Sequence, residues 1–289
     1  MKNYIITTDS TCDLPEDYLS CHGLRVLPLY YNFNGTVYGG KNDLKPKEFY
    51  DKMRSGAMPT TMAVNPDTAN EVFSGLLKEG YDILHIAFSS NLSGSCSVAA
   101  TTARELCDEI SGAKITIVDS LCASLGEGLL VYKAVKLKES GKSIDEVADW
   151  LEKNKLNLCH IFTVDDLHHL HRGGRVSKAT AIIGTLISVK PILHVDNEGH
   201  LVPLINVRGR KKALVSLVDQ MEKRIEGFRD KNDIVFISHG DSLEDAEYVA
   251  SMVKERFGIK EVLIDFVSPT IGAHSGPGTI AMFFIGNPR

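Results

Sequence analysis

The sequence predicts an α/β protein of two domains: a three-layer α/β/α domain with a parallel sheet, followed by an α/β domain with a mixed sheet. The chain has 289 residues, which is about two domains at roughly 150 residues each. Strand-like and helix-like segments alternate over the first half, a pattern typical of a parallel sheet covered by helices. After about residue 157 a hairpin signal interrupts the alternation. We therefore expect domains over residues 1–160 and 161–289.

The first half contains the elements of the parallel domain. Expected strands are short runs rich in aliphatic and aromatic residues: 4–8, 25–31, 81–88 and 115–118. Expected helices begin near a proline, serine or aspartate; one begins near residue 13, and the others cover 45–55, 67–78, 95–109, 128–139 and 144–154. Residues 57–66 contain two prolines and no clear period, which predicts a loop.

The second half has a different order of elements. Asp196-Asn197-Glu198-Gly199 is a turn signal between two strand-like runs, which predicts a hairpin. The expected strands are 158–164, 191–195, 201–207, 233–238, 261–266 and 279–285. The expected helices are 211–225 and 243–257, and residues 168–172 precede a break at Gly173-Gly174. A hairpin together with βαβ units predicts a mixed sheet.

Composition excludes several classes of protein. The net charge of −5 argues against a dedicated nucleic-acid binder. No run approaches about 18 apolar residues, and the apolar N-terminal run is too short for a signal peptide, so we expect a cytoplasmic protein without stable membrane insertion. The six cysteines form no C-x-x-C pair, which favours reduced thiols.

Common catalytic and cofactor motifs are missing from the sequence. Gly141-Lys142-Ser143 lacks the glycine five residues earlier that a phosphate loop needs, and no G-x-G-x-x-G or G-x-S-x-G is present. His168, His169 and His171 cluster, but no cysteine or carboxylate completes a ligand set at metal-binding spacing. We expect no metal and no cofactor.

Three polar segments lie at the ends of expected elements, where sites in α/β folds collect. They are Thr60-Thr61, residues 89–95 and residues 272–278. Ser93 precedes a helix, whose N-terminus favours an anion, although simple N-capping explains such a segment equally well. Ser93, Thr61 and His274 together would form a set of hydrogen-bond donors for one carboxylate, which only accepts hydrogen bonds. Thr60, Ser120 and Ser275 are secondary polar candidates.

Two basic clusters stand out in an acidic chain. Arg172, Arg175 and Lys178 surround Gly173-Gly174, and Arg208 begins a second cluster with Arg210, Lys211 and Lys212. Such clusters suit a phosphate or an acidic partner surface, or they form a solvated face.

Taken in order, these segments resemble the DegV family over essentially the whole chain. The motifs that carry the resemblance are Thr8-Asp9-Ser10, Asp13-Leu14-Pro15, Pro59-Thr60-Thr61, 89–94, Val118-Asp119-Ser120, 170–177, Lys190-Pro191-Ile192-Leu193, 207–213 and 274–278. One departure is Met62-Ala63, which stands where the family loop often has polar residues.

The resemblance implies a carrier rather than an enzyme. A long-chain fatty acid of the palmitate or oleate class would lie between the domains, with its carboxylate at Thr61 and Ser93 and His274 close by. A separate ATP-dependent fatty acid kinase would convert that carboxylate into an acyl phosphate, with Arg175 and Arg208 facing the kinase. Two alternatives remain: a hydrolase or acyltransferase that uses Ser93 and His274, and a binder of another small anion.

Overall fold

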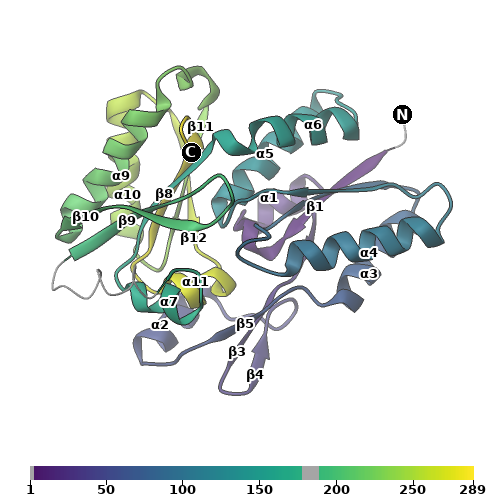
Figure 1. Ribbon diagram of the computed structural model, residues 1–289, viewed down its shortest axis with the longest axis horizontal. Helices are drawn as coiled ribbons and strands as arrows, with labels where there is room; N and C mark the ends of the chain where they lie inside the picture. The colour runs from purple at the N-terminus through teal and green to yellow at the C-terminus, as the bar shows by residue number, and fades with distance from the viewer. Residues whose placement is uncertain (1–2, 178–188) are drawn as a thin grey trace.

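The computed structural model describes residues 3–177 and 189–289 (Figure 1). A four-stranded parallel sheet has the order β2-β1-β6-β7. Its strands are β1 (Tyr4–Asp9), β2 (Arg25–Leu27), β6 (Asp82–Ala87) and β7 (Ile115–Asp119). All six residues of β6 are buried, as expected for a central strand covered on both faces.

Helices cover both faces of this sheet. On one face lie α3 (Pro66–Lys78) and α4 (Ser95–Glu109), and on the other lie α5 (Leu125–Glu139) and α6 (Ile144–Asn154). The short α1 (Glu16–Cys21) follows β1. Short 3-10 turns span Ser10–Cys12, Lys155–Asn157 and Arg229–Lys231. The predicted three-layer arrangement of the first half is therefore present.

The second sheet is mixed and has six strands in the order β10-β9-β8-β13-β11-β12. They are β8 (Leu158–Thr163), β9 (Val189–Val195), β10 (Leu201–Arg208), β11 (Ile234–His239), β12 (Glu261–Phe266) and β13 (Ile280–Ile285). Within this sheet, as far as the structure describes it, β11–β12 is the one parallel pair, and the other pairs are antiparallel. Helices α9 (Arg210–Ile225) and α10 (Leu243–Phe257) cover one face, and α5 packs against the other. This confirms the α/β class with a parallel sheet and a separate mixed sheet.

A third, small sheet was not predicted. It has the order β4-β3-β5, from β4 (Thr36–Tyr38), β3 (Tyr30–Phe33) and β5 (Thr60–Met62). The expected strand over 25–31 is in fact two strands in different sheets, separated by Pro28-Leu29. Proline has no N–H for a ladder, and the Leu29 N–H donates to Ser10 Oγ at 3.0 Å. The expected loop over 57–66 contains β5, whose three residues are too few to show a period.

Helix α11 (Pro269–Ser275) was not among the expected elements. Pro269 occupies its first turn and Gly276, at φ 80°, ends it. The helix packs against α7 (Leu167–Arg172) and against α2 (Pro46–Arg54), which lies beside the small sheet (Figure 1). Tyr50 of α2 donates from its hydroxyl to the Val267 carbonyl at 2.9 Å. These contacts hold the small sheet against the C-terminal half of the chain.

The expected domain boundary at 160/161 falls inside β8, and one apolar core runs across both large sheets. That core contains Ile6 and Leu84 from the first sheet and Phe236 and Phe283 from the second. Lys178, assigned to a basic cluster, lies outside the described residues. Within 3–177 and 189–289, no helix is long and apolar enough to cross a membrane.

Candidate functional site: a cavity between the sheets

A cavity lies between the two large sheets and the α11 region. It has about 930 Å³ of space free of protein atoms, part of it open to solvent. Apolar side chains form much of its wall: Leu29, Met62, Phe88, Leu92, Phe162, Leu170, Val195, Leu201, Val267, Ile271 and Phe283. Along β13, Ala281 and Phe283 alternate with residues that pack under α9 and α10 on the other face of the sheet. Both therefore present their side chains to the cavity.

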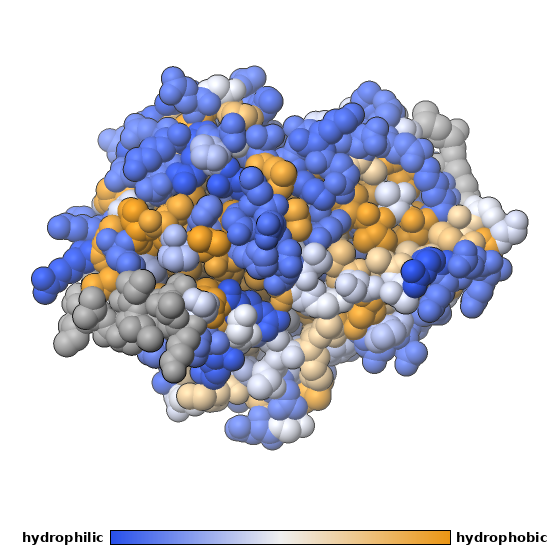
Figure 2. Space-filling model, in the orientation of Figure 1, coloured by the Kyte–Doolittle hydropathy of each residue, from blue (hydrophilic) through white to orange (hydrophobic). Residues whose placement is uncertain are grey.

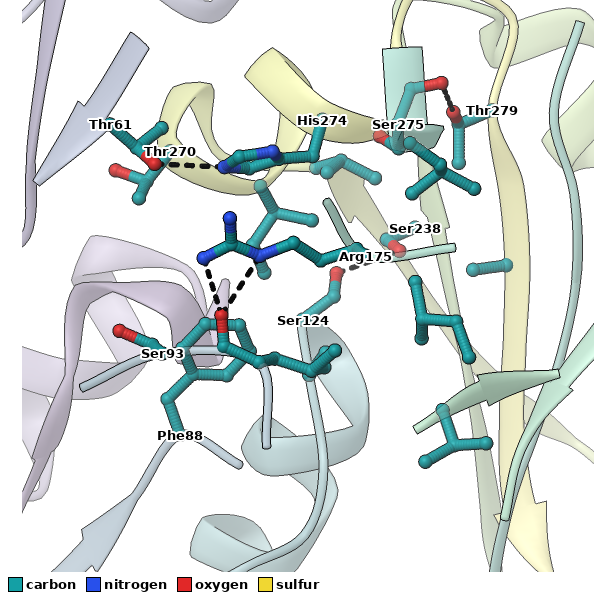
Figure 3. A pocket seen from close by; sticks show the side chains of 18 of the residues that line it. Thr61, Phe88, Ser93, Ser124, Arg175, Ser238, Thr270, His274, Ser275 and Thr279 are labelled. Carbon is teal, nitrogen blue, oxygen red and sulfur yellow. Dashed lines mark hydrogen bonds between the residues drawn. The ribbon is translucent and has the colours of Figure 1, made fainter. Parts of the chain in front are cut away.

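Two predicted residues meet directly in this cavity. Thr61 Oγ1 and His274 Nε2 are 2.8 Å apart, although 213 positions separate them in the chain (Figure 3). Thr61 pairs with buried Tyr31 in the small sheet, so its side chain points toward α11 rather than to solvent. Gly173 makes room for the histidine, because a Cβ there would lie 1.9 Å from His274 Nδ1. The space that the His274 imidazole needs explains why the first residue of the Gly173-Gly174 pair is a glycine.

The imidazole of His274 is neutral at physiological pH. Burial lowers its pKa to about 4, and the nearby Arg175 and Arg172 add to this effect. The Nδ1 atom of His274 and the Oγ of the neighbouring Ser275 are buried and have no hydrogen-bond partner in the described residues. Two adjacent polar atoms on α11 are thus left without the partner that buried groups normally have.

Ser93 lies in the cavity wall two residues before α4. Its Oγ is 2.9 Å from Ser95 Oγ and accepts a hydrogen bond from the Ser95 N–H at 3.2 Å. Ser95 Oγ in turn accepts from the Val64 N–H at 3.2 Å, which ties this turn to the segment after β5. The start of α4 and the end of the small sheet are therefore held in one geometry.

Arg175 is part of the cavity wall and is partly buried. Its Nε and Nη2 donate to the Leu92 carbonyl at 3.0 and 2.6 Å, and Nη1 donates to the Gly173 carbonyl. In the view of Figure 3 the guanidinium lies between His274 and Ser93. A guanidinium has five N–H donors, so about two remain for another acceptor. The donor set expected from the sequence, Thr61, Ser93 and His274, did not include this cation.

Other predicted residues lie elsewhere. Thr60 is exposed because neighbouring residues of a strand point to opposite faces. Ser120 is fully buried but does not line the cavity; its Oγ accepts from the Cys122 N–H at 3.0 Å. Arg208 is exposed at the end of β10. The role expected for Arg208, contact with a partner, stays a prediction.

The cavity also has polar wall residues that sequence reasoning missed: Ser124, His160, Ser238, Thr270 and Thr279. Apart from Ser124, these residues lie in expected strands or outside any expected element, so the sequence gave no sign that their side chains line a cavity. Only Ser124 had one, since Ser before a helix is a common N-terminal residue. No group of three or more metal-ligating side chains occurs in the part of the chain that is described.

Comparison with known proteins agrees with this fold. Residues 3–287 match the family model described as "uncharacterised protein, DegV family". The chain is 44% identical to a DegV domain-containing protein of Clostridium perfringens, over 100% of this chain and 99% of that one. The chain belongs to the DegV family.

Two solved structures of this family are similar throughout. One is described as fatty acid binding of a DegV family protein from Thermus thermophilus; it has a TM-score of 0.87, 30% identity, and coverage of 99% of this chain and 100% of that one. The other is DegV, a fatty acid binding protein from Bacillus subtilis, with a TM-score of 0.85, 28% identity and coverage of 99% and 100%.

Proposed function

We propose that this protein binds a long-chain fatty acid in the cavity, with the carboxylate held by Thr61, Ser93 and the α11 residues His274 and Ser275. The observation that carries the proposal is a mostly apolar cavity in which hydroxyl and imidazole groups gather, with His274 Nδ1 and Ser275 Oγ lacking a hydrogen-bond partner in the described residues. A carboxylate accepts hydrogen bonds from several donors at once, and an alkyl chain matches the apolar wall. The relatives from Thermus thermophilus and Bacillus subtilis are described as fatty-acid-binding proteins, which supports this class of ligand.

The energetic argument favours a long chain. Each buried CH₂ contributes about 0.8 kcal/mol, so a 16-carbon chain gains on the order of 12 kcal/mol before the costs of association. The spare N–H groups of Arg175 add a charge-assisted contact for the head group. We expect a ligand held this tightly to survive purification.

We expect Thr61→Ala and Ser93→Ala each to weaken fatty-acid binding by about 1–3 kcal/mol, because each leaves a polar partner unsatisfied. Isothermal titration with palmitate measures the effect. Thr60→Ala is the matched control, since it removes the same atoms from the exposed face of β5. Unchanged affinity in both site variants would remove these hydroxyls from the head-group site.

We further propose that a separate ATP-dependent fatty acid kinase phosphorylates the bound acid, so that this chain acts as a carrier without catalysis. The alternative hydrolase would need Ser93 paired with His274 as base. In the described residues the short contact of His274 Nε2 is to Thr61, and that of Ser93 Oγ is to Ser95. These contacts favour the carrier. Release of p-nitrophenol from acyl esters, abolished by Ser93→Ala, would favour the hydrolase.

Arg208→Ala is expected to lower acyl-phosphate formation by a cognate kinase several-fold while the affinity for palmitate stays within twofold. The reason is that Arg208 is exposed on β10 and is not among the cavity-lining residues. Acyl phosphate formed from labelled palmitate gives the readout. Arg175→Ala is expected to lower both quantities, because its guanidinium lines the cavity. An Arg208→Ala protein that supports full kinase turnover contradicts the assignment.

A further inference from the structure

Three polar side chains from distant parts of the chain form a hydrogen-bonded row that ends in the cavity wall. They are Asp13, which follows the turn Ser10–Cys12, Ser124, which precedes α5, and Ser238 of β11. Ser124 Oγ is hydrogen-bonded to Asp13 Oδ2 and lies 2.9 Å from Ser238 Oγ. Both serines line the cavity, on the side next to β11 and apart from the Thr61–His274 pair (Figure 3).

The row interrupts an apolar strip of the sheet. Ser238 pairs with Ala281 across β11 and β13, and Ala281 pairs with Phe162 of β8. Ala281 and Phe162 both line the cavity. A chain that lies along this strip therefore contacts the Ser238 hydroxyl, which is fully buried.

The backbone is strained to hold this row. Ser124 has φ 55° and ψ −146°, and Asp13 has φ 53°, conformations that residues other than glycine adopt at a cost in free energy. Strain of this kind persists where surrounding structure fixes it, and it is concentrated at ligand sites.

In each arrangement of the row, the Ser238 hydroxyl keeps either its lone pairs or its O–H available to the cavity. When Asp13 is ionised, Ser124 donates to Asp13 and Ser238 donates to Ser124, so Ser238 offers only lone pairs to the cavity. When Asp13 is protonated on Oδ2, the donors run the other way and the Ser238 O–H is free. Burial raises the pKa of Asp13 to about 7, and the Asp265 carboxylate adds to this, so both states are populated near neutral pH.

We propose that the cavity accepts long-chain acids that carry a hydroxyl group on the acyl chain, and that Ser238 binds this hydroxyl. A plain alkyl chain offers no partner to Ser238, and in the state with a free O–H it leaves a buried donor unpaired, which is costly. A ketone on the acyl chain only accepts hydrogen bonds, so it matches only the state in which the Ser238 O–H is free. A hydroxyl both donates and accepts, so it matches Ser238 in both states. This proposal rests on the proposed function, because it assigns a second contact within the same cavity.

The test compares the affinity of the purified, delipidated protein for stearate and for stearates hydroxylated at positions 2, 10, 12 and 18. We expect at least one mid-chain isomer to bind tenfold or more tightly than stearate. We expect Ser238→Ala to reduce this advantage to less than threefold. Ser120→Ala is the matched control, since Ser120 is equally buried but does not line the cavity.

The outcomes separate this proposal from the proposed function. If stearate binds and every hydroxylated isomer binds no tighter, fatty-acid binding stands and the hydroxyl site is wrong. An advantage that persists in Ser238→Ala also overturns the assignment. If neither stearate nor any isomer binds, both proposals fail. The wild-type comparison gives its answer even if the variant does not fold.

Discussion

Replacing Ala281 by phenylalanine is expected to lower the affinity for palmitate by more than a hundredfold while decanoate binds almost as it does to the wild type. Ala281 lies on the central strand β13 with its side chain toward the cavity. A benzyl group there fills the space that the outer part of a long chain would occupy. Loss of contact for about four to six CH₂ groups removes about 3–5 kcal/mol.

The two chain lengths serve as each other's control. Overpacking a core costs typically about 1–3 kcal/mol of stability, so thermal unfolding must show that Ala281→Phe is folded before binding is measured. Equal losses for decanoate and palmitate would show a general disturbance instead of a shortened cavity. Undiminished palmitate binding would place the acyl chain away from β13.

The second large effect concerns Glu127, a fully buried carboxyl group near the first sheet. It accepts hydrogen bonds from Thr8 Oγ1 at 2.7 Å, Thr11 Oγ1 at 2.9 Å and the Asp9 N–H at 3.3 Å. Burial raises the pKa of Glu127 well above its ordinary value, and the Asp9 carboxylate adds to this effect. Burial likewise raises the pKa of Asp9, to about 7.

Glu127→Ala is expected to lower the free energy of unfolding by about 3–5 kcal/mol at pH 7, because it leaves three buried donors without an acceptor. Glu127→Gln keeps an acceptor oxygen, imitates the protonated carboxyl, and should cost less than about 1.5 kcal/mol. Urea denaturation at pH 7 measures both. The matched control is Glu105→Gln on the exposed face of α4. If Glu127→Gln destabilises as much as Glu127→Ala, the group is ionised and the raised pKa is wrong.

The carboxyl groups of Asp9 and Glu127 also set how the free energy of unfolding changes with pH. A carboxyl whose pKa is higher in the folded state stabilises the fold at low pH, and this contribution is lost as pH rises through the folded pKa. For Asp9 and Glu127, stability should therefore fall as pH rises from about 4 through the raised folded pKa, which is about 7 for Asp9, and Glu127→Gln should flatten that fall. His85 and His274, with pKa values lowered to about 3 and about 4, act oppositely but only below about pH 6.5. A stability profile of Glu127→Gln that falls with pH as steeply as that of the wild type would contradict this.

Sequence patterns predicted the large sheets well because each strand there is a clear apolar run. The run at 81–88 became β6 with every residue buried, and the turn at Asp196–Gly199 did form the β9–β10 hairpin. The small sheet escaped prediction because its strands have three or four residues and alternate weakly. The chain breaks between β2 and β3 at Pro28, where the sequence suggested only an edge or a bulge.

The site was predicted in its residue types but not in its geometry. Thr61 and His274 were chosen separately, and their contact depends on the small sheet and α11, neither of which was predicted. Ser268-Pro269 and Gly276 are ordinary signals for the start and end of a helix, and they would have indicated α11. Arg175 stood out for its charge, whereas its position in the cavity wall depends on carbonyl acceptors that no sequence pattern shows.

The identity of the lipid that leaves the protein on denaturation tests the central claim most directly. Protein purified without added lipid is denatured, extracted with organic solvent and analysed by mass spectrometry, and a delipidated sample is titrated with palmitate and oleate. We expect close to one long-chain acid per chain in the extract and saturable uptake by the delipidated sample. An extract free of long-chain acids, together with no uptake of either acid, would contradict the account.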